Sequence, residues 1–470
     1  MGDYLTIRSD RASGDSEGPP PRYFVQKQDH FDGSNAQTWL QAYYVNDTFW
    51  KPGSDAPVFL CVGGEGPALT GAAVESSVHC NVAVEFLKDT QALMFAVEHR
   101  YYGCHNMSAC PVSSFAEPAR DLRFLSSRQA LADLAEFHAH ATDHYGLTGN
   151  NKWVTFGGSY PGMLAGWARL RFPHLFHASI ASSAPVQAKL DFPEYNDVTR
   201  YAYTVTSVGG SGACAEAIAQ GHAEIGKLLG DASGRELLSR KFKTVPNASW
   251  LEDREHQREF AGEGVAYFPS QGNDPACESP ACNIGKICAI MTDSKRGDAV
   301  NRLAAVAESQ AQWLDASSNN ADVGWVDYWG WQTCTEFGFY QTCEVGSQCF
   351  YTQGLDTLQD NMAFCTEIFG IEPSTVASNV NYTNVYYGAL KPVGTRVLWP
   401  NGEVDPWSAL SVLKSPQPGQ PTLWVKGASH HFWTHPSAST DQQSVVQARA
   451  AIRRQIWTWL QDPSLTTALQ

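Results

Sequence analysis

One short segment constrains the fold of this chain more than any other, namely Gly157-Gly158-Ser159-Tyr160-Pro161-Gly162. The apolar run 153–156 precedes it, and the largely apolar residues 163–167 follow it. This order predicts a strand, a tight glycine turn and a helix, with one serine at the apex of the turn. A serine there has its hydroxyl exposed and helix N–H groups behind it. The strict form G-x-S-x-G has glycine where Pro161 stands, and an ordinary glycine-rich connection fits this segment equally well.

The first part of the chain alternates short apolar strands with helices. Strands are expected at 57–62, 92–97, 153–156 and 178–182, and a helix over 128–145 has its apolar side chains on one face. Such alternation predicts a mostly parallel sheet with helices on both faces.

The pattern changes after Asp191 and resumes near the end of the chain. Residues 192–390 lose the alternation and carry eight of the twelve cysteines, whereas strands at 396–399 and 422–425 restore it. One domain with an insertion explains this order better than two domains in series. The predicted division is a disordered segment over 1–22, a first core part over 23–190, a helical cap over 191–390 and a second core part over 391–470.

Three residue types needed for nucleophilic catalysis occur along the chain in an order that indicates a catalytic triad. A serine needs a base, and the base needs an orienting carboxylate. In α/β-hydrolases these follow the order Ser, Asp, His, and this chain offers Ser159, then Asp405 and His430, each after a predicted strand. Asp405 has a turn-capping alternative, and His431 competes as the base. A metal site at these histidines is disfavoured, because no carboxylate or cysteine lies at ligand spacing.

An acyl-transfer site also needs two N–H donors for the developing oxyanion. The backbone of Tyr160, directly after the serine, is the first candidate. Gly63 and Gly64, after the 57–62 strand, offer the second, although a plain tight turn is the alternative for these glycines.

Composition bounds the location and the partners. A net charge of −15 argues against nucleic acid or an anionic membrane as a partner. No apolar run reaches the roughly 18 residues of a membrane span. Residues 1–21 show no secretory leader, so if the protein is secreted, this sequence starts after, or without, its native leader. Twelve cysteines together with four N-glycosylation sequons nevertheless favour the secretory route over a cytosolic enzyme with free thiols. The sequons are at Asn46, Asn106, Asn247 and Asn381.

Five motifs together resemble the lysosomal Pro-X carboxypeptidase family of serine peptidases, which also includes dipeptidyl peptidase II and thymus-specific serine protease. They are Gly63-Gly64-Glu65-Gly66-Pro67, Glu98-His99-Arg100-Tyr101-Tyr102-Gly103, the segment 157–162, Asn401-Gly402-Glu403-Val404-Asp405-Pro406-Trp407 and Gly427-Ala428-Ser429-His430. The resemblance runs from about residue 28 to the final helix. It implies an α/β-hydrolase core, a disulfide-bearing helical cap over the site, and Ser159, Asp405 and His430 as the triad.

Within this family, the segment 329–340 is most similar to the thymus-specific branch. Gly330 stands where dipeptidyl-peptidase members have an aspartate that binds the substrate amino terminus, with Asp327 or Glu336 as substitutes. Candidate substrate-binding residues are Glu65, Trp329, Trp331, Glu336 and Trp407, the aromatic ones with core packing as the alternative.

The predicted function is hydrolysis of peptides through an acyl-enzyme on Ser159, without a cofactor or metal, and with post-proline exopeptidase action of the carboxypeptidase or dipeptidyl-peptidase type. The predicted location is outside the cell or in the lysosome or vacuole. The sequence leaves open whether the protein forms a homodimer. The alternatives are an esterase or lipase on the same fold and a catalytically silent peptide-binding protein.

Overall fold

A single large sheet organises the protein. The computed structural model describes residues 18–104, 109–112, 122–317 and 328–462, and the prediction of disorder over 1–22 lies mostly outside them. Among these residues, eight strands form a sheet in the order β1-β2-β4-β3-β5-β6-β9-β10. Their bounds are Arg22–Lys27 (β1), Thr38–Asn46 (β2), Val58–Val62 (β3), Leu93–Val97 (β4), Trp153–Gly158 (β5), Ala178–Ser182 (β6), Val397–Gly402 (β9) and Thr422–Val425 (β10).

The strand directions identify the fold. Strand β2 runs antiparallel to β1 and β4, while the pairs from β4 to β10 are all parallel. This strand order with an antiparallel second strand is that of the α/β-hydrolase fold, as the sequence predicted. Because parallel strands end at the same edge, the loops after β3, β5, β9 and β10 gather there.

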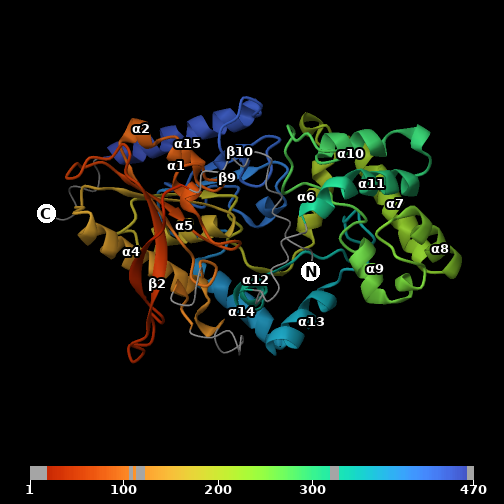
Figure 1. Ribbon diagram of the computed structural model, residues 1–470, viewed down its shortest axis with the longest axis horizontal. Helices are drawn as coiled ribbons and strands as arrows, with labels where there is room; N and C mark the ends of the chain where they lie inside the picture. The colour runs from red at the N-terminus through yellow and green to blue at the C-terminus, as the bar shows by residue number, and fades with distance from the viewer. Residues whose placement is uncertain (1–17, 105–108, 113–121, 318–327, 463–470) are drawn as a thin grey trace.

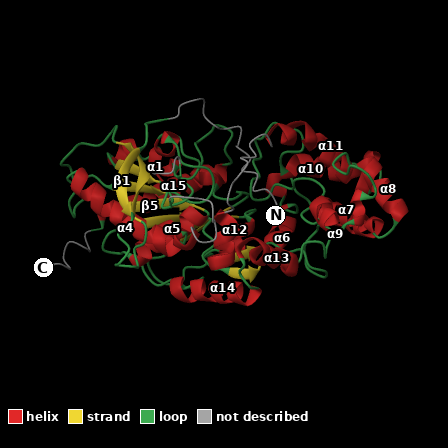
Figure 2. Ribbon diagram, turned by 60° about the horizontal axis from the view of Figure 1, so that its bottom comes forward, coloured by secondary structure: helices red, strands yellow, loops and turns green. Residues whose placement is uncertain are grey.

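Helices cover both faces of the sheet (Figures 1 and 2). On one face lie α4 (Ser127–His144) and α5 (Tyr160–Arg171); on the other lie α1 (Asn81–Val84), α2 (Leu87–Thr90) and the C-terminal α15 (Gln443–Gln461). Strands β3 and β4 are therefore buried along their whole length. The helix expected over 128–145 is confirmed as α4, and Ser126 caps its N-terminus, where the Ser126 side chain accepts from the Gln129 N–H.

The chain between β6 and β9 is mostly helical; much of it forms the lobe drawn in yellow-green and green at the right of Figure 1, and its last helices, drawn in teal and blue, lie near the bottom centre. Its helices are α6 (Glu194–Ala202), α7 (Gly212–Leu229), α8 (Ala232–Lys241), α9 (Arg254–Ala261), α10 (Ile284–Met291), α11 (Ala299–Ser317), α12 (Tyr328–Gln332), α13 (Leu358–Phe369) and α14 (Pro373–Tyr387). A separate apolar cluster forms among α7, α10 and α11. The short strands β7 (Lys189–Asp191) and β8 (Gly338–Tyr340) pair in parallel.

This insertion does not sit apart from the core. The ring of Tyr387, at the end of α14, stacks on Trp167 of α5 with ring centroids 3.6 Å apart. The boundaries at 190 and 390 stay a prediction.

All twelve cysteines lie in the described residues and form six disulfides. The pair Cys104–Cys110 closes a short local loop. Such a number of disulfides is typical of the secretory route. The other pairs are Cys61–Cys80, Cys214–Cys288, Cys277–Cys282, Cys334–Cys365 and Cys343–Cys349.

The surface features relevant to location are the sequons and the helices. Asn247 and Asn381 are exposed, whereas Asn46 is partly buried and donates from Nδ2 to the carbonyl of Val74 at 2.8 Å. Asn106 lies outside the described residues. Within the part of the chain that the structure describes, no helix is long and apolar enough to cross a membrane.

Candidate active site

The glycine turn after β5 holds Ser159 in a strained conformation, with φ 66° and ψ −133°. Its backbone N–H donates to the carbonyl of Ser182 on the neighbouring strand at 3.0 Å. Glycine is required at both flanks, since a Cβ at Gly157 would lie 2.2 Å from the carbonyl oxygen of Pro161, and one at Gly162 would lie 2.7 Å from the Ser182 oxygen. The glycine that the strict motif has at the position of Pro161 is therefore supplied one residue later by Gly162. Ser159 lies at the apex of the turn, as expected.

Asp405 and His430 come from the loops after β9 and β10 and form a hydrogen bond, with Nδ1 of His430 2.9 Å from Oδ1 of Asp405. Asp405 is fully buried, and the same oxygen accepts the Trp407 N–H at 3.0 Å. A carboxylate only accepts, so the proton lies on Nδ1 and Nε2 offers its lone pair. Nε2 is buried and has no hydrogen-bond partner among the described residues.

His431, the competing base, has different contacts. Its backbone N–H donates to Oγ of Ser183 at 2.8 Å, and its Nδ1 lies 3.1 Å from Oγ1 of Thr434. Its ring packs against the glycine turn 157–162, where a Cβ at Gly158 would lie 2.7 Å from Cγ of His431. Burial holds its pKa well below the usual range, and the neighbouring histidines lower the pKa further. Asp405 thus orients His430 and not His431.

The loop after β3 packs directly on the glycine turn 157–162. A Cβ at Gly64 would lie 2.3 Å from Cγ of Pro161. The N–H of Gly63 donates to the carbonyl of Val97 at 2.9 Å and extends the sheet. Of the two glycines expected to supply an oxyanion donor, Gly63 therefore has its donor occupied, and Gly64 is the candidate that remains.

Glu65, the next residue of this loop, brings a carboxylate close to Ser159. The Ser159 hydroxyl lies near this side chain and lowers the pKa of its carboxyl group. Oε2 of Glu65 is buried without a hydrogen-bond partner among the described residues. Burial raises the pKa of Glu65 to about 7, although its own backbone N–H, the charge of His430 and the nearby Ser159 hydroxyl oppose the rise. The sequence had suggested Glu65 only as a substrate contact.

The Tyr160 side chain is anchored from two directions. His99 places Nδ1 2.7 Å from the carbonyl of Arg100, so Nδ1 carries the proton and Nε2 accepts from the Tyr160 hydroxyl at 2.9 Å. Gln332 of α12 donates to the same hydroxyl at 3.0 Å. Burial lowers the pKa of His99 to about 4, which keeps this imidazole neutral. The residue that would supply the first oxyanion donor is thus held by both the core and the insertion.

Glu336 lies in this network and not in an open pocket. Its carboxylate accepts from the backbone N–H and the hydroxyl of Ser127 and from Nε2 of Gln332. The residue is buried, and burial raises its pKa. These contacts favour a structural role at the start of α4 over the substrate role expected from the sequence.

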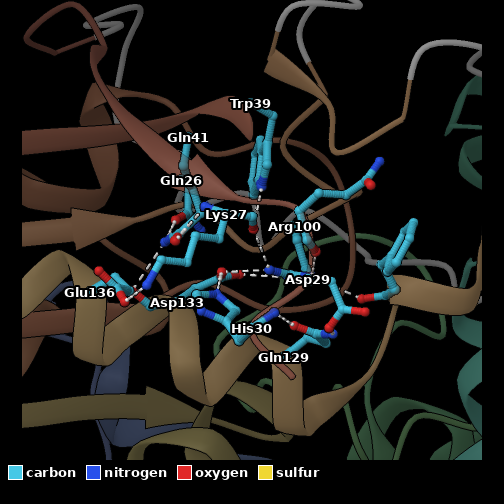
Figure 3. Close-up of polar contacts among 12 residues, drawn as sticks. Gln26, Lys27, Asp29, His30, Trp39, Gln41, Arg100, Gln129, Asp133 and Glu136 are labelled. Carbon is cyan, nitrogen blue, oxygen red and sulfur yellow. Dashed lines mark hydrogen bonds and ion pairs between the residues drawn. The ribbon is translucent and has the colours of Figure 1, made fainter. Parts of the chain in front are cut away.

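The motif 98–103 contributes a buried ion pair that ties the first strands to α4 (Figure 3). The Arg100 guanidinium contacts both carboxylate oxygens of Asp133 at 2.7 and 2.6 Å and donates to the carbonyls of Gln28 and Phe124. His30 contacts the same carboxylate at 2.7 Å. The pair fixes the turn that carries His99.

Aromatic side chains lie beside the candidate triad. The Trp407 ring, 3% exposed, lies 6.3 Å from the ring of His430, and Trp329 lies 5.6 Å from Tyr160. Phe339 connects Trp407 with Trp329 through ring contacts at 5.2 and 6.5 Å. Trp331 faces elsewhere, since its Nε1 donates to the carbonyl of Leu125 and its ring packs on Phe369.

Residues 26–452 match the model of the family described as Serine carboxypeptidase S28. This match spans most of the chain. The chain belongs to the S28 family of serine peptidases. The resemblance drawn from the five motifs is confirmed by this match.

Curated relatives agree with the family and with the branch predicted within it. The chain is 35% identical over 467 residues to the human thymus-specific serine protease, covering 94% of this chain and 87% of that protein. The mouse thymus-specific serine protease is 34% identical, with 94% and 88% covered. Human lysosomal Pro-X carboxypeptidase is 27% identical, also with 94% and 88% covered.

Among solved structures, a proline iminopeptidase from Mycobacterium smegmatis covers 94% of this chain and 98% of its own, with 12% identity and a TM-score of 0.36. A likeness this low carries no argument about activity. Assignment of the fold rests instead on the strand order given above.

Proposed function

We propose that this S28 family member hydrolyses peptides through an acyl-enzyme on Ser159. The observation that carries the proposal is the buried hydrogen bond between Asp405 and His430, which leaves Nε2 as a lone-pair acceptor at the sheet edge where Ser159 stands. In this scheme His430 takes the Ser159 proton as Oγ attacks the carbonyl carbon. Asp405 stabilises the imidazolium that forms, and the N–H groups of Tyr160 and Gly64 bind the oxyanion.

The second half of the reaction returns the groups to their starting state. His430 gives its proton to the leaving amine as the scissile C–N bond breaks. Water then attacks the acyl carbon while His430 takes a proton from it, and the Ser159 oxygen leaves and regains that proton. No metal or cofactor enters these steps.

We place proline at the scissile bond, in an exopeptidase of the carboxypeptidase or dipeptidyl-peptidase type. The support is the aromatic wall of Trp407, Phe339 and Trp329 beside the candidate base, which suits a flat apolar ring. The name of the Pro-X carboxypeptidase relative points the same way. Six disulfides and that relative's name support secretion or a lysosomal or vacuolar location.

A labelling experiment tests the chemistry. The purified protein is treated with a fluorophosphonate, which reacts only with an activated serine, and the modified residue is found by mass spectrometry. Labelling of Ser159 that disappears in Ser159→Ala supports the proposal, with Ser309→Ala on α11 as the matched control. Full turnover by Ser159→Ala would refute it.

A peptide panel tests the specificity. Amino-blocked and unblocked Xaa-Pro-Xaa peptides are incubated with the protein from pH 4 to pH 8, and the products are read by mass spectrometry. Cleavage restricted to free amino termini indicates a dipeptidyl peptidase. Cleavage of blocked peptides after proline indicates the carboxypeptidase type, and equal cleavage of peptides without proline contradicts the proline assignment.

A further inference from the structure

A short segment of the insertion, between α9 and α10, touches both loops that carry the candidate triad. The Ser270 hydroxyl donates to the carbonyl of Val404 at 2.7 Å, next to Asp405. The carbonyl of Gln271 accepts the backbone N–H of His430 at 3.1 Å. Residues far apart in the chain are therefore joined through Ser270 and Gln271.

The side chain of Gln271 makes two more hydrogen bonds, both through Oε1. It accepts from Nε1 of Trp407 at 2.9 Å and from the Tyr195 hydroxyl at 2.8 Å. An indole N–H is only a donor, so the orientation of the Gln271 amide is fixed by chemistry: the oxygen faces Trp407. Tyr195 lies on α6 and also contacts the Trp407 ring, with centroids 5.5 Å apart.

Trp407 depends on this contact for its direction. It is 3% exposed, and its ring also touches Phe192 and Phe339, none of which offers a polar group to the indole N–H. Without Gln271 the buried N–H would lose its partner, and a rotation toward another acceptor would move the ring beside His430.

We propose that Gln271 is a positioning residue, which acts through the indole of Trp407 to shape the substrate side of the site. The inference rests on the proposed function, because it assigns Trp407 to the wall that contacts substrate. Gln271 itself touches neither Ser159 nor the reacting bond. The insertion thereby contributes to specificity through one hydrogen bond and not merely by covering the site.

The test compares four variants of the full-length protein. Gln271→Met keeps the length of the side chain and removes the acceptor, Gln271→Glu restores an acceptor, Trp407→Phe removes the indole N–H, and Gln271→Met with Trp407→Phe completes a cycle. Gln220→Met, on the exposed face of α7, is the matched control for the substitution itself. Peptide kcat and KM are measured together with the rate constant for labelling by a small fluorophosphonate.

Gln271→Met is expected to lower peptide kcat/KM about 30-fold, as misplacement of a contacting group does, with labelling of Ser159 changed by less than about threefold. Gln271→Glu should regain most of the loss, and the double variant should be no slower than Trp407→Phe alone. Three results would overturn the inference: Gln271→Met with unchanged kinetics, an equal loss in labelling, or additive losses in the cycle. Absence of labelling in the unmodified protein would instead remove the proposed function, on which this inference depends.

Discussion

Replacing Asp405 by asparagine removes one negative charge from the site and leaves its hydrogen bonds in place. Both donors that reach this side chain, Nδ1–H of His430 and the Trp407 N–H, converge on Oδ1, while Oδ2 is buried with no hydrogen-bond partner among the described residues. The amide oxygen of asparagine can occupy the Oδ1 position and accept both bonds. The imidazole therefore keeps its tautomer and orientation, and only the charge changes.

The size of the effect follows from the geometry. During the reaction His430 becomes positive beside Asp405, with the charge centres about 4 Å apart, and an effective dielectric constant near 20 gives an attraction of about 4 kcal/mol. At 1.36 kcal/mol per factor of ten, the loss of that attraction corresponds to a fall in kcat of about 10³-fold. KM should change little, because Asp405 is fully buried and does not face the substrate.

The assay is steady-state turnover of a proline-containing peptide together with the rate of fluorophosphonate labelling, both of which should fall for Asp405→Asn. Thermal unfolding confirms that the variant is folded. Asp356→Asn is the matched control, a buried aspartate in the insertion that contacts Arg258 and Asn361, and it should leave kcat unchanged. A fall of less than about tenfold for Asp405→Asn would show that the carboxylate charge does not stabilise the imidazolium.

Three further predictions concern pH and stability. Burial raises the pKa of Glu65 to about 7, so the carboxylate ionises as pH rises through 7 and then competes for the Ser159 proton. We expect kcat/KM to decline above that pH and Glu65→Gln to flatten the decline in a pH–rate profile; an unaltered profile would show that Glu65 does not cause the decline. Arg100→Met breaks a buried ion pair and should lower the free energy of unfolding by about 3–5 kcal/mol, measured with denaturant, while Lys27→Ala, which breaks an exposed pair with Glu136, should cost less than about 1 kcal/mol; equal costs would contradict the burial argument. Replacing Cys214 and Cys288 by alanine opens a loop of 74 residues and should cost about 4 kcal/mol in the same assay, and an unchanged midpoint would mean that the bond does not constrain the unfolded chain.

Sequence reasoning was most successful where a structural feature follows from local chain geometry. The strand–turn–helix around Ser159 needs only neighbouring residues, and the glycines at 157 and 162 are dictated by contacts within that segment. The strand ends before Asp405 and His430 are likewise local features, and parallel strands bring such ends to one edge of the sheet. The fold class and the placement of these residues were therefore predictable from the order of the elements.

Contacts between distant and irregular segments were not predictable. Gln271 lies in a loop with no periodic pattern, and its bonds to Trp407 and His430 arise only when the insertion packs against the core. The bond from Gln332 to Tyr160 has the same origin. The burial of Glu336 could not be predicted for a related reason, since a buried acid and an exposed acid look alike in a sequence.

Strands β6 and β9 are neighbours in the sheet, where Ser179 pairs with Val397 and Ile180 with Leu398. The whole insertion nevertheless lies between these two strands in the chain. During synthesis the ribosome therefore releases Ser159, the proposed nucleophile, long before Asp405 and His430. Until β9 emerges, the edge of β6 that pairs with it is exposed, and an unpaired strand edge is a template for association with other chains. If Ser159 and His430 act as we propose, the same delay keeps the growing polypeptide inert toward its surroundings, because Ser159 has no base until His430 has been made.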